Sequence, residues 1–410
     1  MIKTLTSAFK NKDIRKKLLY TLMMLVVIRI GSLLPIPGVD TEYFSTLLSG
    51  FNSGDLSYLS AFTGGSFEKM SLFALSITPY ITSSIIIQLL TIAIPKLEEM
   101  QKEGEDGRKK IASITRYVTI ALALIESIAM AVGFGRQGLI KDYKDMSTIH
   151  YVTCIIVVVA ALTAGSAVLM WIGERITEKG VGNGISIVLL INIISGMPSD
   201  FVTLYSTFVA NKSIARGVTV AVIIAAIVIA VVVLVVILQD GERRIPVQYS
   251  QKVAGRKTIG GQATNIPLKV NTAGVMPIIF ASSIMQFPVI IVQLFTSNSY
   301  EWTKYLSQSY WCRVQMPKYS IGLLLYIILV GVFAYFYTSI TFNPVQIADN
   351  LKKAGGVVPG ITPGRSTSEY LNKILNYIVF IGAVGLMIVA LIPIMCTGFF
   401  NASVSFGGTS

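Results

Sequence analysis

The stretch VTVAVIIAAIVIAVVVLVVIL, residues 218–238, contains a single polar side chain, Thr219, in 21 residues. A helix needs about 20 apolar residues to cross the hydrocarbon core of a bilayer. This stretch therefore predicts a membrane-spanning helix. The composition agrees, because 53% of the 410 residues are hydrophobic and only 13% are charged. A soluble domain carries about 25% charged residues.

Eight further stretches have a similar apolar character, so the sequence predicts nine spans in all. In chain order they are residues 18–36, 70–94, 117–134, 151–173, 184–195, 218–238, 272–295, 321–342 and 374–396. The weakest is 184–195, which is short and begins in glycines. Without it, however, the basic loops described next would face both sides of the membrane.

Lysine and arginine are distributed unevenly between the loops. The N-terminal segment and the loops at 96–116, 174–183, 239–271 and 343–373 hold 24 of the 34 basic residues, and the other loops hold 9. Because cytoplasmic loops are enriched in Lys and Arg, this bias places the N-terminus in the cytoplasm. It also accounts for the net charge of +13 through membrane topology, so we expect no direct DNA binding.

The two halves of the chain look related. The spans at 70–94 and 272–295 each carry a mid-span proline, Pro79 or Pro277, followed by a pair of serines. The serine pairs are Ser83 with Ser84 and Ser282 with Ser283. Matching interruptions five spans apart predict two inverted-topology halves of five spans each, residues 1–196 and 197–410. Such a repeat needs a tenth span, which would begin where this chain stops, at residues 407–410.

No catalytic or cofactor-binding pattern is found. The phosphate-loop pattern G-x-x-x-x-G-K-[ST] is absent, and the glycine cluster at 180–184 lacks its lysine and a preceding strand. One histidine and no G-x-S-x-G motif leave no nucleophile–base pair. The three cysteines have the spacing of neither a disulfide framework nor a metal site. We therefore expect no enzyme, no cofactor and no metal, and energy for directional work must come from a partner or an ion gradient.

Two ionisable residues lie clearly inside predicted spans, Arg29 and Glu126. Arg29 either pairs with a neighbour or extends toward the interface. A carboxylate in a span must face the protein interior or water, because it is costly in lipid. Glu126 is then either a polar contact between helices that must part or a hydrogen-bonding partner that fixes packing. Both interpretations remain open from the residues alone.

Loops 239–271 and 343–373 are each about 30 residues long, which exceeds what a connection needs. Their basic residues predict a docking surface for an acidic or RNA-bearing partner. These residues are Arg243, Arg244, Lys252, Arg256, Lys257, Lys352, Lys353 and Arg365.

Loop 37–69 differs, because its residues 56–62 are small and mostly apolar and are followed by Gly64 and Gly65, which permit a sharp turn. It is either a re-entrant segment or an ordinary outer loop.

Five blocks of sequence resemble the SecY family, in the same order and over nearly the whole chain. They are Arg29-Ile-Gly with PIPG at 35–38, FALSITPYI at 73–81, MWIGERITEKGVGNGIS at 170–186, LKVNTAGVMP at 268–277 and ADNLKK at 348–353. The resemblance implies an all-α polytopic membrane protein whose two five-span halves enclose an hourglass pore. Its function would be that of a protein-conducting channel, which translocates unfolded preproteins and inserts membrane proteins laterally.

The resemblance also assigns residues to roles. A pore ring of apolar side chains falls on Ile77, Ile81, Leu189 and Ile279. A plug falls on Leu56, Tyr58, Leu59, Phe62, Gly64 and Gly65. A lateral gate, formed by spans two and three against seven and eight, includes Ser83, Ser84, Gln88, Glu126, Asn271, Ser282 and Ser283. The basic loops resemble docking sites for the SecA ATPase and the ribosome.

The implied partners are SecE- and SecG-like small membrane subunits, the SecA motor, the ribosome, preproteins with signal sequences, and lipids of a bacterial inner membrane.

This sequence departs from the family at two places. Thr362 stands where the family's Pro-Gly-x-Arg-Pro-Gly loop has arginine, which puts coupling to the motor in doubt, and the chain ends where the tenth span opens. Two other function classes remain: a secondary transporter using Glu126, and an insertase-type membrane protein without a pore.

Overall fold

The computed structural model describes residues 10–50, 63–135, 139–140, 147–206, 214–249, 252–254, 257–259, 263–295, 300–312 and 317–400. Helices dominate it, and every stretch predicted to span overlaps one. The longer helices are α2 (Lys12–Leu33), α3 (Thr41–Gly50), α5 (Thr78–Ala93), α6 (Pro95–Lys102), α7 (Glu105–Phe134), α8 (Thr148–Lys179), α9 (Gly184–Leu204), α10 (Ile214–Asp240), α11 (Met276–Phe295), α13 (Ile321–Thr341), α14 (Pro344–Lys353) and α15 (Arg365–Phe400). Short helices α12 (Thr303–Leu306), η3 (Gln308–Tyr310) and η4 (Pro317–Ser320) lie between α11 and α13.

Five helical stretches in the described part of the chain are long and apolar enough to cross a membrane: α7, α8, α10, α13 together with its neighbours η4 and α14, and α15. The pair α5 and α6, bent by 106°, adds a sixth if it is counted as one span. The apolar parts of α9 and α11, Gly184–Pro198 and Met276–Val289, are shorter. Helix α2 corresponds to the first predicted span and carries Lys16, Lys17 and Arg29. The prediction of a helical polytopic membrane protein is confirmed, whereas the count of nine spans stays a prediction.

The second predicted span is wrong at its start, because residues 70–77 are not helical. Met70 and Ser76 have positive φ angles of 41° and 53°, and helix α5 begins only at Thr78. Pro79 therefore lies in the first turn of α5 rather than in mid-span, where its missing N–H leaves no hydrogen bond unmade. Pro277 is likewise the second residue of α11. The two prolines thus mark equivalent helix starts in the two halves of the chain.

The glycine cluster at 180–184 is a helix-to-helix turn. Gly182 has a φ of +72°, which favours glycine, and the Asn183 side chain caps α9 by accepting a hydrogen bond from the backbone N–H of Ile185 at 3.1 Å. A Cβ on Gly184 would collide with the backbone carbonyl of Gly173 in α8. The weak fifth span is therefore a real helix. It extends to Leu204, nine residues beyond the predicted end at 195.

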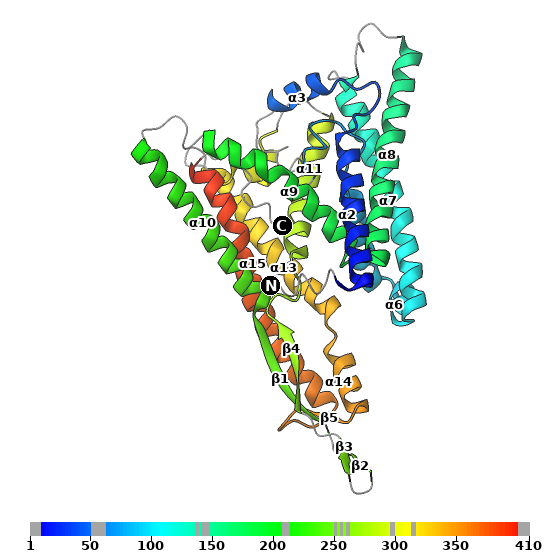
Figure 1. Ribbon diagram of the computed structural model, residues 1–410, viewed down its shortest axis with the longest axis vertical. Coiled ribbons are helices and arrows are strands. Elements are labelled where there is room, and N and C mark those ends of the chain that lie inside the picture. The colour runs from blue at the N-terminus through cyan, green and yellow to red at the C-terminus, as the bar shows by residue number, and fades with distance from the viewer. Residues whose placement is uncertain are drawn as a thin grey trace.

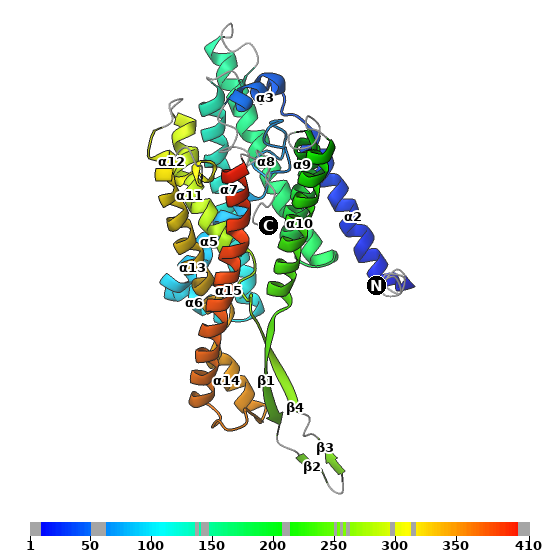
Figure 2. The same cartoon turned by 90° about the vertical axis from the view of Figure 1, so that its left-hand side faces the viewer.

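The helices form two groups (Figure 1). Helices α2, α7 and α8 lie on one side, and α10, α13 and α15 on the other, with α9 and α11 between them. Direct packing of α7 against α11 joins the two groups, and the view at right angles shows α7 close to α11 as well (Figure 2). The largest apolar core lies between the two groups: it takes residues from α5, α9 and α11 and also from α2, α8, α13 and α15. A second core packs α3 and the segment at 67–75 against α7 and α8.

Loops 239–271 and 343–373 form one folded body, which we name the basic extension, at the end of the molecule where α14 lies (Figure 1). Strand β1 (Glu242–Tyr249) pairs antiparallel with β4 (Ala263–Lys269) and with the short β5 (Gly356–Val357), in the order β4-β1-β5. At its tip β2 (Lys252–Ala254) pairs with β3 (Lys257–Ile259). Ile245, Val247 and Leu268 bury their side chains against Leu371 and Ile374 of α15. The sequence analysis treated this body as two separate loops and missed its sheet.

The close approach of α8 to the non-helical segment before α5 yields a test of the fold. A Cβ on Gly165 of α8 would collide with the backbone carbonyl of Leu72. We expect Gly165→Ala to lower the free energy of unfolding by about 1–3 kcal/mol, the usual cost of overpacking. Thermal unfolding in detergent, followed by circular dichroism, measures the effect. The matched control is Gly196→Ala in α9, where a Cβ meets nothing within 4 Å, and equal melting temperatures for the two variants would contradict the packing described.

Candidate functional site

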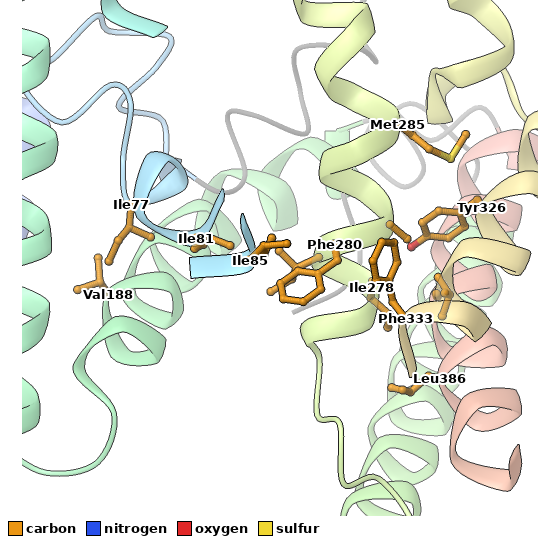
Figure 3. Close-up of a cluster of buried hydrophobic side chains, with 14 of the residues drawn as sticks. Ile77, Ile81, Ile85, Val188, Ile278, Phe280, Met285, Tyr326, Phe333 and Leu386 are labelled. Atoms are coloured by element: carbon orange, nitrogen blue, oxygen red, sulfur yellow. The ribbon is translucent and has the colours of Figure 1, made fainter. Parts of the chain in front are cut away.

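The four residues assigned to the pore ring belong to one apolar cluster. Ile77 is 1% exposed, Ile81 9% and Ile279 6%, and Leu189 packs against the same cluster while remaining partly exposed. They come from the start of α5, from α9 and from α11, and the cluster that holds them forms the junction between the two helix groups. Figure 3 shows Ile81 and Ile85 of α5 between Val188 of α9 and Phe280 of α11. The structure therefore brings the four positions together, and their role as a ring stays a proposal.

The cluster is larger than the sequence analysis predicted. Ile85 extends the series of Ile77 and Ile81 at four-residue spacing along one face, a signal that the sequence contained. On α9 the fully buried residue is Val188, which is 0% exposed, rather than its neighbour Leu189. Phe280 packs edge to face on Phe333 of α13, with ring centroids 5.8 Å apart. The junction is therefore filled by branched aliphatic chains on α5 and α9 and by aromatic rings on α11 and α13.

The residues assigned to the lateral gate make their hydrogen bonds within their own half of the chain. Ser83 donates to the backbone carbonyl of Pro79 at 2.7 Å, and Gln88 donates to Ser84 at 3.4 Å, so both bonds stay on α5. In the other half, Ser282 accepts from Gln308 at 3.4 Å. Ser283 follows it on α11 and is half-buried. Among the described residues, these hydroxyls therefore form no hydrogen bond across the contact of α7 with α11.

Glu126 and Asn271 are also not joined to each other. Asn271 is buried and donates to the Gln239 side chain at the end of α10, at 3.3 Å. Glu126 is half-buried on α7, and its carboxylate makes no hydrogen bond or ion pair with another described residue. Neither hydrogen-bonding interpretation of Glu126 finds a partner in the described part of the chain.

Arg29 instead has a partner that the sequence analysis missed. Its guanidinium donates to the Ser195 hydroxyl of α9 at 2.8 Å, and that hydroxyl donates to the backbone carbonyl of Asn192 at 2.6 Å. The Asn192 side chain donates to the Ser76 hydroxyl at 3.1 Å. A polar side chain inside the short apolar span at 184–195 was the available signal, because such residues are costly unless they bond to a neighbour.

Only the end of the assigned plug falls within the described residues. Gly64 and Gly65 have φ angles of +62° and +78°, as expected for a sharp turn. A Cβ on Gly64 would lie 2.7 Å from the Ser195 hydroxyl and 2.9 Å from the backbone carbonyl of Asn192, so the turn packs tightly on α9. The remaining plug residues, Leu56, Tyr58, Leu59 and Phe62, lie outside the described residues.

The basic residues assigned to docking meet on the basic extension. Arg243 and Arg244 are exposed on β1, and Lys352 and Lys353 are exposed in the last turn of α14. Arg244 pairs with Glu242 at 2.6 Å, and Arg365 pairs with Glu369 at 2.9 Å. Exposed pairs of this kind contribute little, about 0–1 kcal/mol, so they leave these cations open to a partner. Lys252 and Lys257 lie on β2 and β3, and Arg256 lies outside the described residues.

Comparison with known proteins gives consistent matches. A SecY family model matches residues 71–410. The protein translocase subunit SecY of Streptomyces galbus is 40% identical over 425 residues, which cover 100% of this chain and 93% of that protein. A solved structure described as "The structure of a protein conducting channel" has a TM-score of 0.59 at 17% identity and covers 96% of this chain and 88% of its own. Sec61 in the canine ribosome-channel complex has a TM-score of 0.58 at 16% identity, with 96% and 87% covered.

The structural matches and the sequence matches support different conclusions. The solved structures, at low sequence identity, share the fold. The family model contains four of the five sequence blocks, and the alignment with the Streptomyces protein extends over the fifth, at 29–38. Together with the helical fold and the apolar junction between two helix groups, the sequence matches establish that this chain belongs to the SecY family.

Proposed function

We propose that this chain is the pore subunit of a protein-secretion translocon, through which unfolded preproteins cross the membrane and membrane proteins leave sideways into lipid. The observation that carries the proposal is the convergence of Ile77, Ile81, Leu189 and Ile279 in one apolar cluster between the two helix groups. The Streptomyces relative that matches the whole chain is itself a protein translocase subunit. A secondary transporter is not favoured, because Glu126 has no ionic partner among the described residues.

An apolar junction suits this task for a physical reason. A constriction lined by aliphatic side chains excludes water and ions by dewetting. Isoleucine and leucine chains can also yield around a passing polypeptide, since their contacts are many and individually weak. The resting channel would thus be sealed by van der Waals packing. No bond would have to break for a polypeptide to enter.

The contact between α7 and α11 is the proposed lateral gate. In the part of the chain that the structure describes, no hydrogen bond from the assigned gate serines crosses it, and interhelical hydrogen bonds in membranes average only about 0.6 kcal/mol. Parting the two helices therefore costs mainly apolar contact, which a signal sequence of similar apolar character can replace. Binding of the signal sequence would then shift the balance from closed to open.

The basic extension is the proposed docking site for a motor or a ribosome. Its exposed cations stand on a folded sheet that joins two loops, so a partner meets a rigid surface. The similar Sec61 structure is a ribosome-channel complex. We further propose that SecE- and SecG-like subunits bind the chain and that a SecA ATPase supplies the energy. The two halves of the chain would be residues 1–196 and 197–410. The chain would lie in the bacterial cytoplasmic membrane with its N-terminus in the cytoplasm.

Crosslinking tests the channel directly. In a chain whose native cysteines are changed to serine, Ile81→Cys should form a disulfide with a cysteine placed in a stalled secretory polypeptide, because the polypeptide occupies the junction. Ile92→Cys, on the same helix but 55% exposed, is the control and should not react. Absence of any Ile81 adduct, together with uptake of a small solute that depends on Glu126, would favour the transporter.

Opening the constriction should make it leak. We expect Ile81→Ser and Ile279→Ser to raise the resting ion conductance severalfold in planar bilayers and to relax the requirement for a functional signal sequence, since a hydroxyl favours water in the narrow pore. The matched control is Ile284→Ser, on the same helix as Ile279 but 46% exposed. Conductance equal to that of the unaltered channel would show that these side chains do not form the constriction.

Reversing charge on the basic extension should weaken docking. We expect Arg243→Glu combined with Arg244→Glu to reduce the affinity for the motor ATPase or the ribosome about tenfold at low salt, roughly 1.4 kcal/mol, and less at high salt. Titration by fluorescence anisotropy at two salt concentrations measures this change. Lys304→Glu combined with Lys318→Glu, in α12 and η4 at the other end of α13, is the charge-matched control. An affinity that responds to neither the double variant nor salt would contradict the docking surface.

A further inference from the structure

A chain of hydrogen bonds joins three segments that are far apart in the sequence. It runs from the Arg29 guanidinium of α2 to the Ser195 hydroxyl of α9, then to the Asn192 backbone carbonyl, at 2.8 Å and 2.6 Å. The Asn192 side chain continues it to the hydroxyl of Ser76 at 3.1 Å. We name these four residues, Arg29, Ser76, Asn192 and Ser195, the polar latch.

The polar latch adjoins the apolar constriction. Ser76 immediately precedes Ile77, and Asn192 follows Leu189 by three residues on α9, so Asn192 and Leu189 share one helix face. Ser76 is 1% exposed and Asn192 is 2% exposed, as deeply buried as the ring positions themselves. A hydrogen bond between Ser76 and Asn192 therefore fixes the distance between the start of α5 and α9 beside the ring.

The backbone around Ser76 requires support from outside. Its φ of +53° is a left-handed conformation that costs a serine about 1 kcal/mol or more, and such strain persists only where the surroundings hold it. The turn at Gly64 packs on the same two residues of α9, with room for no Cβ. Asn192 and Ser195 of α9 thus contact both ends of the 64–76 segment, Gly64 at one end and Ser76 at the other.

Arg29 supplies the charged end of the polar latch. In the described part of the chain its guanidinium makes no ion pair, and it donates a hydrogen bond to Ser195. A bond from a charged donor is stronger than one between neutral groups, and a low dielectric strengthens it further. Arg29 therefore orients the Ser195 hydroxyl toward Asn192, which in turn holds Ser76 by its side-chain hydrogen bond.

We propose that the polar latch is a positioning device, in which Arg29 acts through Ser195 and Asn192 to set the spacing of Ile77 and Leu189 and hence the tightness of the constriction. This inference rests on the proposed function, because it assumes that these side chains form the seal. None of the four residues needs to touch the translocating polypeptide. A purely structural role, which would only tie α2 to α9, predicts a loss of folded protein without a change in selectivity.

The test uses the full chain with its small membrane subunits, reconstituted in vesicles and planar bilayers. The variants are Arg29→Gln, Ser195→Ala and the double variant, with Arg29→Lys as the conservative replacement that keeps a charged donor. Two quantities are measured: the resting ion conductance, and the export of a precursor with a defective signal sequence relative to one with an intact signal. The control, Arg175→Gln, removes the 2.7 Å bond to Glu178, an exposed pair within α8.

We expect Arg29→Gln and Ser195→Ala each to raise the conductance and the export ratio about threefold, the size of one interhelical hydrogen bond in a membrane. The double variant should be no worse than the larger single effect, because both break the same chain of bonds. Arg29→Lys should stay closer to the unaltered protein than Arg29→Gln does. Arg175→Gln should leave both quantities unchanged.

Three results would overturn the polar latch: unchanged conductance and ratio in Arg29→Gln and Ser195→Ala, fully additive effects in the double variant, or an equal fall in export of both precursors without ion leak. A different result would contradict the proposed function. If the unaltered protein does not export the precursor with an intact signal, the channel itself is contradicted, whereas export with a tight Arg29→Gln variant contradicts only the polar latch.

Discussion

Apolar packing where α5, α9 and α11 meet is the constraint on which the rest of the structure depends. The junction must exclude ions at rest and still part for a polypeptide, so it cannot be closed by covalent bonds or ion pairs across the pathway. In the proposed channel, Ile77, Ile81, Leu189 and Ile279 would meet this requirement through van der Waals contact, since all four belong to or pack against one apolar cluster. The polar groups lie beside the junction instead, where Asn192 and Ser76 hold its walls in place.

The long apolar stretches could be predicted from the sequence because their signal is local. Lipid forces the backbone to satisfy its own hydrogen bonds, so twenty apolar residues leave few alternatives to a helix. Where a helix begins was harder to predict. Residues 70–77 are as apolar as the helix that follows, yet Pro79 and the left-handed Ser76 delay α5 until Thr78. Pro79 and Pro277, which the sequence pattern predicts in mid-span, both lie at helix starts.

Contacts between distant segments were the least predictable features. The strand pairing of β1 with β5 joins residues about a hundred positions apart, and no local pattern indicates it, although Ile245 and Val247 alternate as a half-buried strand requires. On α9, adjacent residues face different surroundings, so assigning Leu189 by resemblance overlooked the more deeply buried Val188. Asn271 bonds to Gln239 rather than to a residue across the junction, because the end of α10 comes back beside it.

The central claim is that the apolar junction must open for a polypeptide to pass. The most direct measurement joins α5 to α11 with a short, reducible crosslink between cysteines introduced at Ile81 and Ile279, and compares export before and after reduction. The account predicts that the crosslinked channel exports no precursor and that reductant restores the original rate. Export at an undiminished rate through the crosslinked channel would contradict it, because the polypeptide would then take another path.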